Sequence, residues 1–138
     1  MLDNQRVTGL NDTSQTGRNI ERVLIVEDSA IIAMDVEDCL LDLGIGEVLI
    51  AHSLESGLAL LDSAGLPDWA ILDFQLGDES CELIARRLET ANVPFVLATG
   101  FGERLADEGG FGAFRVLTKP YKKQDLHVVV QDLRVRKA

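Results

Sequence analysis

Five short apolar runs alternate with longer segments in which apolar residues recur at helical spacing, and this alternation begins at Arg22. Short continuous apolar runs suit strands that are buried on both faces of a sheet. Repeated βα units of this kind predict a parallel sheet that is covered by helices. The predicted strands cover residues 23–26, 48–51, 69–73, 95–99 and 114–118.

The fold class that fits this pattern is α/β: a flavodoxin-like (βα)5 three-layer fold with a central five-stranded parallel sheet in the order 2-1-3-4-5. A chain of 138 residues suits one domain, which is expected at 22–138. Residues 1–21 have few apolar side chains, which predicts a flexible N-terminal tail. Five glycines between Gly100 and Gly112 predict a short or disordered fourth helix and a mobile stretch.

The charge balance disfavours some classes of partner. Thirteen Lys and Arg residues stand against 23 Asp and Glu residues, and the net charge of −10 disfavours nucleic acid and anionic membranes. A protein partner or a cation fits better. No apolar stretch approaches the roughly 20 residues of a membrane-spanning helix, so a cytoplasmic protein is expected. Cys39 and Cys81 have no metal-ligand spacing and are interpreted as small buried hydrophobic residues.

Polar side chains stand at the carboxyl ends of the predicted strands, where open parallel sheets bind their ligands. Glu27 and Asp28 follow the first strand, Asp73 ends the third, Thr99 ends the fourth, and Lys119 follows the fifth. We therefore expect these five side chains to converge on one crevice.

Other polar residues are given no role in that crevice. His52 and Ser53 end the second strand, which lies at the sheet edge in the expected order and need not take part. His52 and His127 have no second ligand at metal spacing and are interpreted as ordinary surface or helix-face histidines. Asp78 and Glu79 are interpreted as favouring the N-terminus of the third helix through its dipole.

The three clustered carboxylates predict a bound cation, because without one they would repel each other and raise at least one pKa. Oxygen ligands without His or Cys indicate Mg²⁺. A Mg²⁺ ion beside a carboxylate supports phosphoryl transfer, and a carboxylate nucleophile yields an acyl phosphate, a labile linkage that suits a reversible signal. Thr99 can donate a hydrogen bond to the phosphoryl group, and Lys119 can supply positive charge.

Together these residues resemble the receiver domain of two-component response regulators (CheY-like) over nearly all of the chain apart from the tail. The resemblance implies that Asp73 is the phosphoacceptor, that Thr99 is the hydroxyl residue and that Lys119 grips the phosphoryl oxygens. It also implies that Asp28 binds the metal directly and that Glu27 binds it through water.

The resemblance implies two backbone features as well. The backbone carbonyl of Gln75 would be the third protein ligand of the metal. The peptide bond between Lys119 and Pro120 is expected to be cis, although most X-Pro bonds are trans.

Residues 97–102, Leu-Ala-Thr-Gly-Phe-Gly, are also similar to the FATGUY subgroup of receivers. Members of that subgroup are often single-domain and are served by histidine kinases of the HWE or related groups. Leu97 departs from the subgroup's phenylalanine.

A second departure concerns the switch. Most receivers place a Tyr or Phe three residues before the lysine, where it turns inward on phosphorylation, but this chain has Val116. The hypothesis is instead that Gly100, Phe101 and Gly102 reorder when the neighbouring hydroxyl is drawn to the phosphate.

The function that follows is a single-domain response regulator in a two-component phosphorelay. It accepts a phosphoryl group from a sensor histidine kinase and either switches protein–protein interactions with a downstream target or acts as a phosphate sink. It is not expected to be an enzyme beyond autodephosphorylation, in which Gln75 and Phe101 affect water access. A monomer or weak dimer is expected, with no output domain after Ala138.

Three alternatives are weighed. A Mg²⁺-dependent phosphatase or Toprim-like enzyme normally has a second Asp two residues after the first, where this chain has Gln75. A Rossmann nucleotide binder needs a Gly-rich turn after the first strand, where Glu27-Asp28-Ser29-Ala30 stands. A receiver-like scaffold that is never phosphorylated would be expected to lack one of the five site residues.

Overall fold

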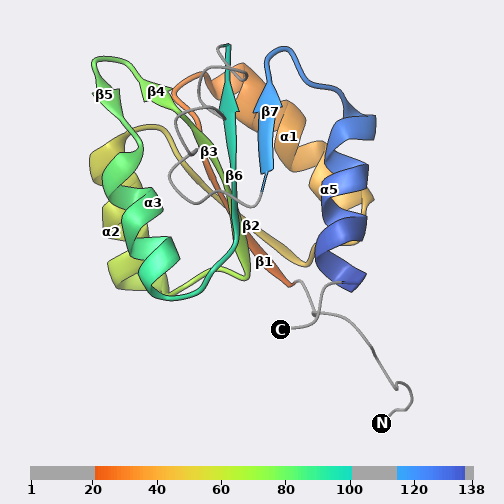
Figure 1. Cartoon of the computed structure of the whole chain (residues 1–138), viewed down its shortest axis with the longest axis horizontal. Helices are drawn as coiled ribbons and strands as arrows, with labels where there is room; N and C mark the ends of the chain where they lie inside the picture. Colours follow the sequence, from red (N-terminus) through yellow and green to blue (C-terminus); the bar gives the residue numbers. More distant parts are fainter. Residues whose placement is uncertain (1–20, 101–114, 136–138) are drawn as a thin grey trace, which may run out of the picture.

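A parallel sheet lies at the centre of the computed structural model, which describes residues 21–100 and 115–135 (Figure 1). Its strand order is β2-β1-β3-β6-β7, which confirms the flavodoxin-like order predicted from the sequence. All four strand pairs are parallel. The strands are β1 (Arg22–Val26), β2 (Glu47–Ala51), β3 (Trp69–Asp73), β6 (Phe95–Thr99) and β7 (Arg115–Thr118).

Helices cover both faces of the sheet and give three layers. In Figure 1, α1 (Ala30–Asp42) and α5 (Lys123–Val135) lie on one face, and α2 (Leu54–Ala64) and α3 (Glu82–Thr90) lie on the other. Ser29 begins α1 by accepting a hydrogen bond from the N–H of Ile32. Side-chain caps of this kind satisfy amide groups that the first helical turn leaves without partners.

Two apolar clusters form the core, one on each face of the sheet. Alternate residues of each strand point to opposite faces, so β1 contributes Val23 and Ile25 to the cluster beneath α1 and α5. It contributes Leu24 and Val26 to the cluster beneath α2 and α3. Because both faces of the sheet are covered, the strands are apolar throughout rather than alternating, as the sequence indicated.

A short antiparallel hairpin follows β3, formed by β4 (Gln75–Leu76) and β5 (Glu79–Ser80). The sequence did not predict it: Asp78 and Glu79 were interpreted as flanking the third helix, but the hairpin occupies this stretch and α3 begins only at Glu82. Gly77 has a φ of 64°, a left-handed conformation that glycine adopts readily. Leu76 is buried, which ties the hairpin to the core.

Some sequence predictions fall on residues outside the described ranges. These are the fourth helix, the switch residues Phe101 and Gly102, and the flexible tail predicted at 1–21, of which residues 1–20 are outside. Within the described ranges, no helix combines the length and apolar character that a membrane span requires.

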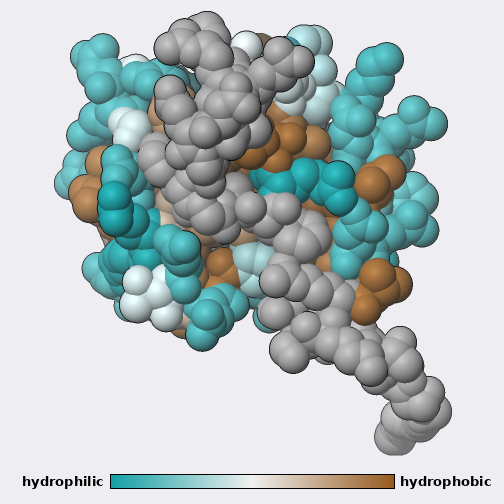
Figure 2. Space-filling model, viewed as in Figure 1, coloured by the Kyte–Doolittle hydropathy of each residue, from teal (hydrophilic) through white to brown (hydrophobic). Residues whose placement is uncertain are grey.

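The surface carries scattered rather than continuous apolar area. In Figure 2 the exposed apolar side chains form separate patches among hydrophilic residues. Exposed large apolar residues include Ile31 and Met34 on α1, Leu83 on α3 and Val128 on α5. Isolated apolar side chains are common on protein surfaces and by themselves indicate no binding site.

Candidate functional site

The carboxyl ends of four strands meet at one edge of the sheet. The registers pair Val26 with Leu72 and Asp73 with Ala98, which aligns the ends of β1, β3 and β6. Thr99 pairs with Thr118, which brings in the end of β7. The residues that end or follow these strands therefore lie close together, as the polar strand ends in the sequence predicted.

Three carboxylates form the centre of this site. Ligand oxygens of Glu27, Asp28 and Asp73 all lie within 4.8 Å of one another. Glu27 is 3% exposed and Asp73 is 5% exposed, whereas Asp28 faces solvent. The cluster contains only oxygen donors and is open on one side, so its chemistry fits a hard divalent cation that keeps some of its water.

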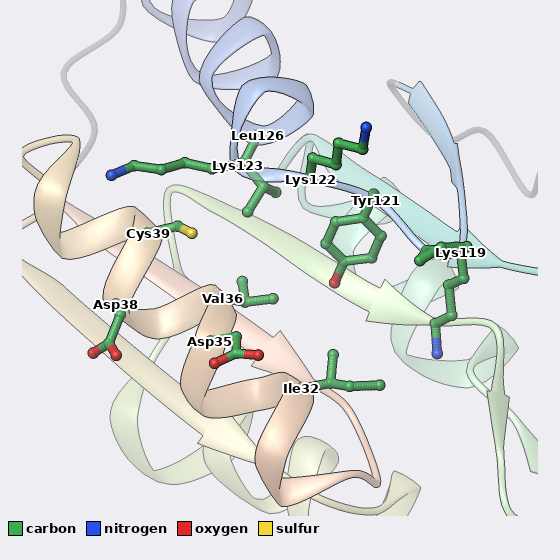
Figure 3. A pocket seen from close by; sticks show the side chains of 11 residues that line it. Ile32, Asp35, Val36, Asp38, Cys39, Lys119, Tyr121, Lys122, Lys123 and Leu126 are labelled. Atoms are coloured by element: carbon green, nitrogen blue, oxygen red, sulfur yellow. The ribbon is translucent and has the colours of Figure 1, made fainter.

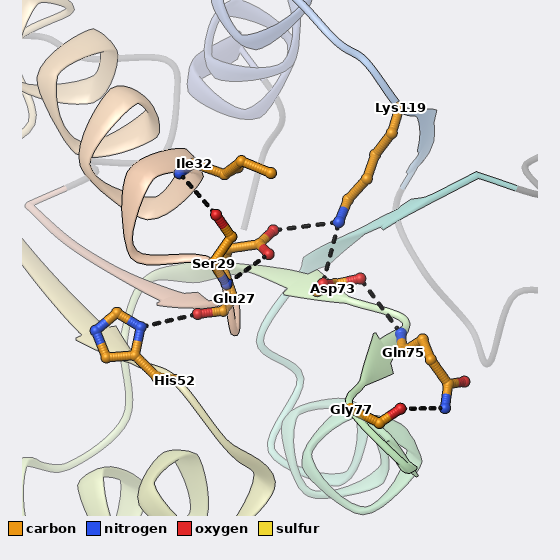
Figure 4. Close-up of polar contacts among 8 residues, drawn as sticks. All are labelled: Glu27, Ser29, Ile32, His52, Asp73, Gln75, Gly77 and Lys119. Carbon is orange, nitrogen blue, oxygen red and sulfur yellow. Dashed lines mark hydrogen bonds and ion pairs between the residues drawn. The ribbon is translucent and has the colours of Figure 1, made fainter.

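Lys119 neutralises part of this negative charge (Figure 4). Its Nζ lies 3.0 Å from Asp73 Oδ2 and 3.3 Å from Glu27 Oε1. Burial acts to lower the pKa of Lys119, but hydrogen bonding and attraction to Asp73, and then to Glu27, outweigh it and raise the pKa. The ammonium therefore stays charged beside the two carboxylates.

For the pKa of Glu27, burial outweighs the contacts that favour the charged form. The pKa of Glu27 is raised to about 7, chiefly by burial. The hydrogen bond from Ser29 and the charge of Lys119 lower this pKa, whereas the charge of Asp73 and a hydrogen bond with it raise it. A proton on Glu27 relieves repulsion between the two buried carboxylates, which is the role that a bound cation would otherwise take.

Backbone groups hold the carboxylates in place (Figure 4). The N–H of Ser29 donates to Glu27 Oε2 at 3.1 Å, and the N–H of Gln75 donates to Asp73 Oδ1 at 3.3 Å. The side-chain amide of Gln75 donates to the carbonyl of Gly77 at 2.9 Å. The hairpin thus places the backbone of Gln75 beside the Asp73 carboxylate.

Thr99 and Lys119 are linked through their backbones. The N–H of Lys119 donates to the carbonyl of Thr99 at 2.8 Å, and the Lys119–Pro120 peptide bond is cis. Thr99 is 4% exposed. Gly100 follows it at the surface, and Val116 on β7 is partly buried against the cluster beneath α2 and α3.

A groove of about 770 Å³ lies beside Lys119, between α1 and the segment that leads into α5 (Figure 3). Ile32 and Leu126 line it together with Tyr121. Burial raises the pKa of Tyr121, with the charges of Glu27 and Asp73 adding to the effect, so its hydroxyl stays protonated. Tyr121 could not be singled out from the sequence, because its position depends on how the β7–α5 connection packs against α1.

The histidine at the end of β2 also touches the site. His52 Nδ1 lies 2.9 Å from the backbone carbonyl oxygen of Glu27. The prediction that His52 is an ordinary surface histidine missed this contact. The register of β1 with β2 sets His52 beside Glu27, but a register alone does not indicate a hydrogen bond between them.

Comparison with known proteins agrees with this geometry. The model of the response regulator receiver domain matches residues 23–131. The chain belongs to the response regulator receiver domain family. Receiver domains bind Mg²⁺ at an acidic pocket and are generally signalling switches rather than enzymes. In this chain Glu27, Asp28 and Asp73 form an acidic group that could hold a metal ion.

One curated relative is the phyllosphere-induced regulator PhyR of Methylorubrum extorquens, which is 31% identical over 111 residues. The match covers 78% of this chain but 41% of PhyR, so the chain spans about two fifths of that protein's length.

Solved structures share the fold. A proposed response regulator from Chloroflexus aurantiacus has 27% identity and a TM-score of 0.73, with 86% of this chain and all of that chain (100%) covered. A CheY-like receiver domain from Methylobacillus flagellatus also has a TM-score of 0.73 at 24% identity, with 84% of this chain and 100% of that chain covered.

Proposed function

We propose that this receiver domain accepts a phosphoryl group on Asp73 from a histidine kinase, with Mg²⁺ bound beside it. The observation that carries the proposal is the position of the Asp73 carboxylate, which lies 3.0 Å from the Lys119 ammonium and within 4.8 Å of the acidic pair. A carboxylate with a fixed cation on one side and room for a metal on the other is suited to attack a phosphorus atom.

The metal would be held by Asp28 and Asp73 directly, by Glu27 through water, and by the backbone carbonyl of Gln75. Two of the three carboxylates are buried and fixed by backbone N–H groups, and the third is exposed to solvent. Bound Mg²⁺ supplies charge neutralisation on the phosphoryl oxygens and orients the donor.

The remaining residues act on the phosphoryl group once it arrives. In the transfer step a bond forms between phosphorus and a carboxylate oxygen of Asp73, and the bond from phosphorus to the donor breaks with its electron pair leaving on the donor. The ammonium of Lys119 then pairs with the phosphoryl oxygens instead of the carboxylate. The hydroxyl of Thr99 donates a hydrogen bond to the phosphoryl group. Attack by water on the phosphorus atom then breaks its bond to Asp73 and releases inorganic phosphate, and Gln75 and Phe101 affect the access of that water.

The output is a change in protein binding. Val116 lacks an aromatic ring to turn inward, so the switch uses Gly100, Phe101 and Gly102 instead. A similarity to the FATGUY subgroup supports this route and an HWE-type kinase. The same proposal has a receiver domain at residues 22–138 behind a flexible tail, which acts in the cytoplasm as a monomer or weak dimer. Either a downstream protein target or a role as a phosphate sink is compatible with such a domain.

Intact mass spectrometry after incubation with acetyl phosphate and Mg²⁺ tests the proposal. We expect one added phosphoryl group on the wild-type protein and none on Asp73→Asn. Asp78→Asn, which alters an exposed carboxylate on the adjacent hairpin, is the matched control and should still be modified. EDTA should abolish the reaction.

Two outcomes would count against the proposal. A phosphoryl group that persists in Asp73→Asn would place the acceptor elsewhere. A folded wild-type protein that acquires none would favour a receiver-like scaffold, and continuous release of phosphate from many substrates would favour a Mg²⁺-dependent phosphatase.

A further inference from the structure

The backbone hydrogen-bond ladder between β1 and β2 ends at Glu27, the first acidic residue of the site. Up to that point the strands pair in register from Arg22 with Glu47 to Val26 with Ala51. The N–H of Glu27 continues the ladder by donating to the carbonyl of Ala51 at 2.9 Å. In a parallel ladder the next bond would run from the N–H of Ser53 to the carbonyl of Glu27.

That next bond is replaced by the start of α2. The N–H of Ser53 donates to Ser56 Oγ at 3.1 Å, and the N–H of Ser56 donates to Ser53 Oγ at 3.1 Å. These two bonds form the capping box that begins α2. The carbonyl of Glu27 therefore loses the backbone donor that the ladder would otherwise provide.

The side chain of His52 fills this place. Its Nδ1 lies 2.9 Å from the Glu27 carbonyl oxygen. A dashed line marks this contact in Figure 4. Because a carbonyl oxygen can only accept a hydrogen bond, Nδ1 carries the proton. Glu27 is then held at three points: its N–H by Ala51, its carboxylate by the N–H of Ser29, and its carbonyl by His52.

The carbonyl of Glu27 has a special position in the site, because it belongs to the peptide unit that joins Glu27 to Asp28. A peptide unit is planar, so fixing the direction of its C=O also fixes the direction of the N–H and Cα of the next residue. Both acidic residues therefore depend on the orientation of this one plane. Outer groups that orient ligands commonly affect metal affinity even when they do not touch the metal.

We propose that His52 is a positioning residue for the acidic pair: its Nδ1–H replaces the missing ladder bond and orients the Glu27–Asp28 peptide for cation binding. This proposal rests on the proposed Mg²⁺ site, although the hydrogen bond on which it depends exists without the metal. His52 acts only through the backbone and touches neither the cation nor the phosphoryl group.

Mg²⁺ titration of three variants, followed by amide chemical shifts of the site, tests this role. His52→Ala should weaken Mg²⁺ binding about threefold to tenfold, the equivalent of one lost hydrogen bond. His52→Asn should restore affinity to within about twofold, because its amide nitrogen is attached to Cγ as Nδ1 is and can donate the same bond. His127→Ala, which removes an exposed histidine on α5, should bind Mg²⁺ like the wild type.

The metal-free protein provides a second readout. The ¹⁵N shifts of the His52 ring should show a protonated Nδ1, and in His52→Ala the amide signal of Asp28 should move while the unfolding midpoint changes little.

The outcomes separate the two proposals. If the wild-type protein binds Mg²⁺ and His52→Ala binds it with the same affinity, the positioning role is overturned and the proposed function stays intact. A ring protonated on Nε2 alone overturns it as well. Wild-type protein that shows a protonated Nδ1 but no Mg²⁺ binding overturns the proposed metal site, and the positioning role for cation binding with it.

Discussion

Leu72 and Asp73 are neighbours on β3 and are almost equally hidden from solvent, with exposures of 0% and 5%, but their surroundings differ. Leu72 packs into the apolar cluster beneath α2 and α3, and its burial stabilises the fold by about 1.5–3 kcal/mol. Asp73 has Lys119 and the N–H of Gln75 around it instead. Burial of a charge is unfavourable unless such partners are present. Apolar burial in the interior of the strand therefore stabilises the fold. It offsets the free-energy cost of keeping charged groups buried at the end of the strand.

Replacing Leu72 with Ala should have the largest effect. We expect a loss of about 2–5 kcal/mol in the free energy of unfolding, because the change opens a cavity in a closely packed cluster. Leu83→Ala is the matched control, since Leu83 lies on α3 with 55% exposure and its loss should change stability little. Urea denaturation measures both variants. Equal losses would show that the interior is not the source of stability.

Replacing Lys119 with Met should have an intermediate effect. It leaves Glu27 and Asp73 buried without their shared cation, and we expect a loss of about 3 kcal/mol, the lower end for a broken buried ion pair, that added Mg²⁺ partly restores. Lys123→Met is the control: its ion pair with Asp42 has the same 3.0 Å length but is exposed, so its loss should matter little. Urea midpoints with and without Mg²⁺ decide the comparison, and equal effects for the two lysines would contradict it.

The smallest expected effect is a pH dependence from Glu27 in the metal-free protein. Its pKa is about 7 in the folded state and near 4.5 otherwise, so the folded state holds a proton that the unfolded chain releases. Stability should therefore fall by about 1–3 kcal/mol as the pH rises from 4.5 to 7. The difference between wild type and Glu27→Gln in EDTA isolates this fall. A constant difference across that window would show that the pKa of Glu27 is the same in the folded and unfolded states.

Much of the fold could be predicted because each strand contains a short apolar run that a polar residue ends or follows. The site residues Asp73, Thr99 and Lys119 could be found for the same reason, since parallel strands bring their carboxyl ends together. The β4–β5 hairpin could not be predicted, because its two strands have only two residues each and carry no periodic signal. The contact of His52 could not either, because it depends on which donors the capping box of α2 leaves for Glu27.

The lysine that balances the buried acids comes from the last strand connection, whereas the acids come from β1 and β3. During synthesis, the amino-terminal part of a chain leaves the ribosome first. Glu27 and Asp73 therefore emerge without the ammonium group that lets them lie side by side. A nascent chain therefore cannot complete this site until β7 has joined the sheet.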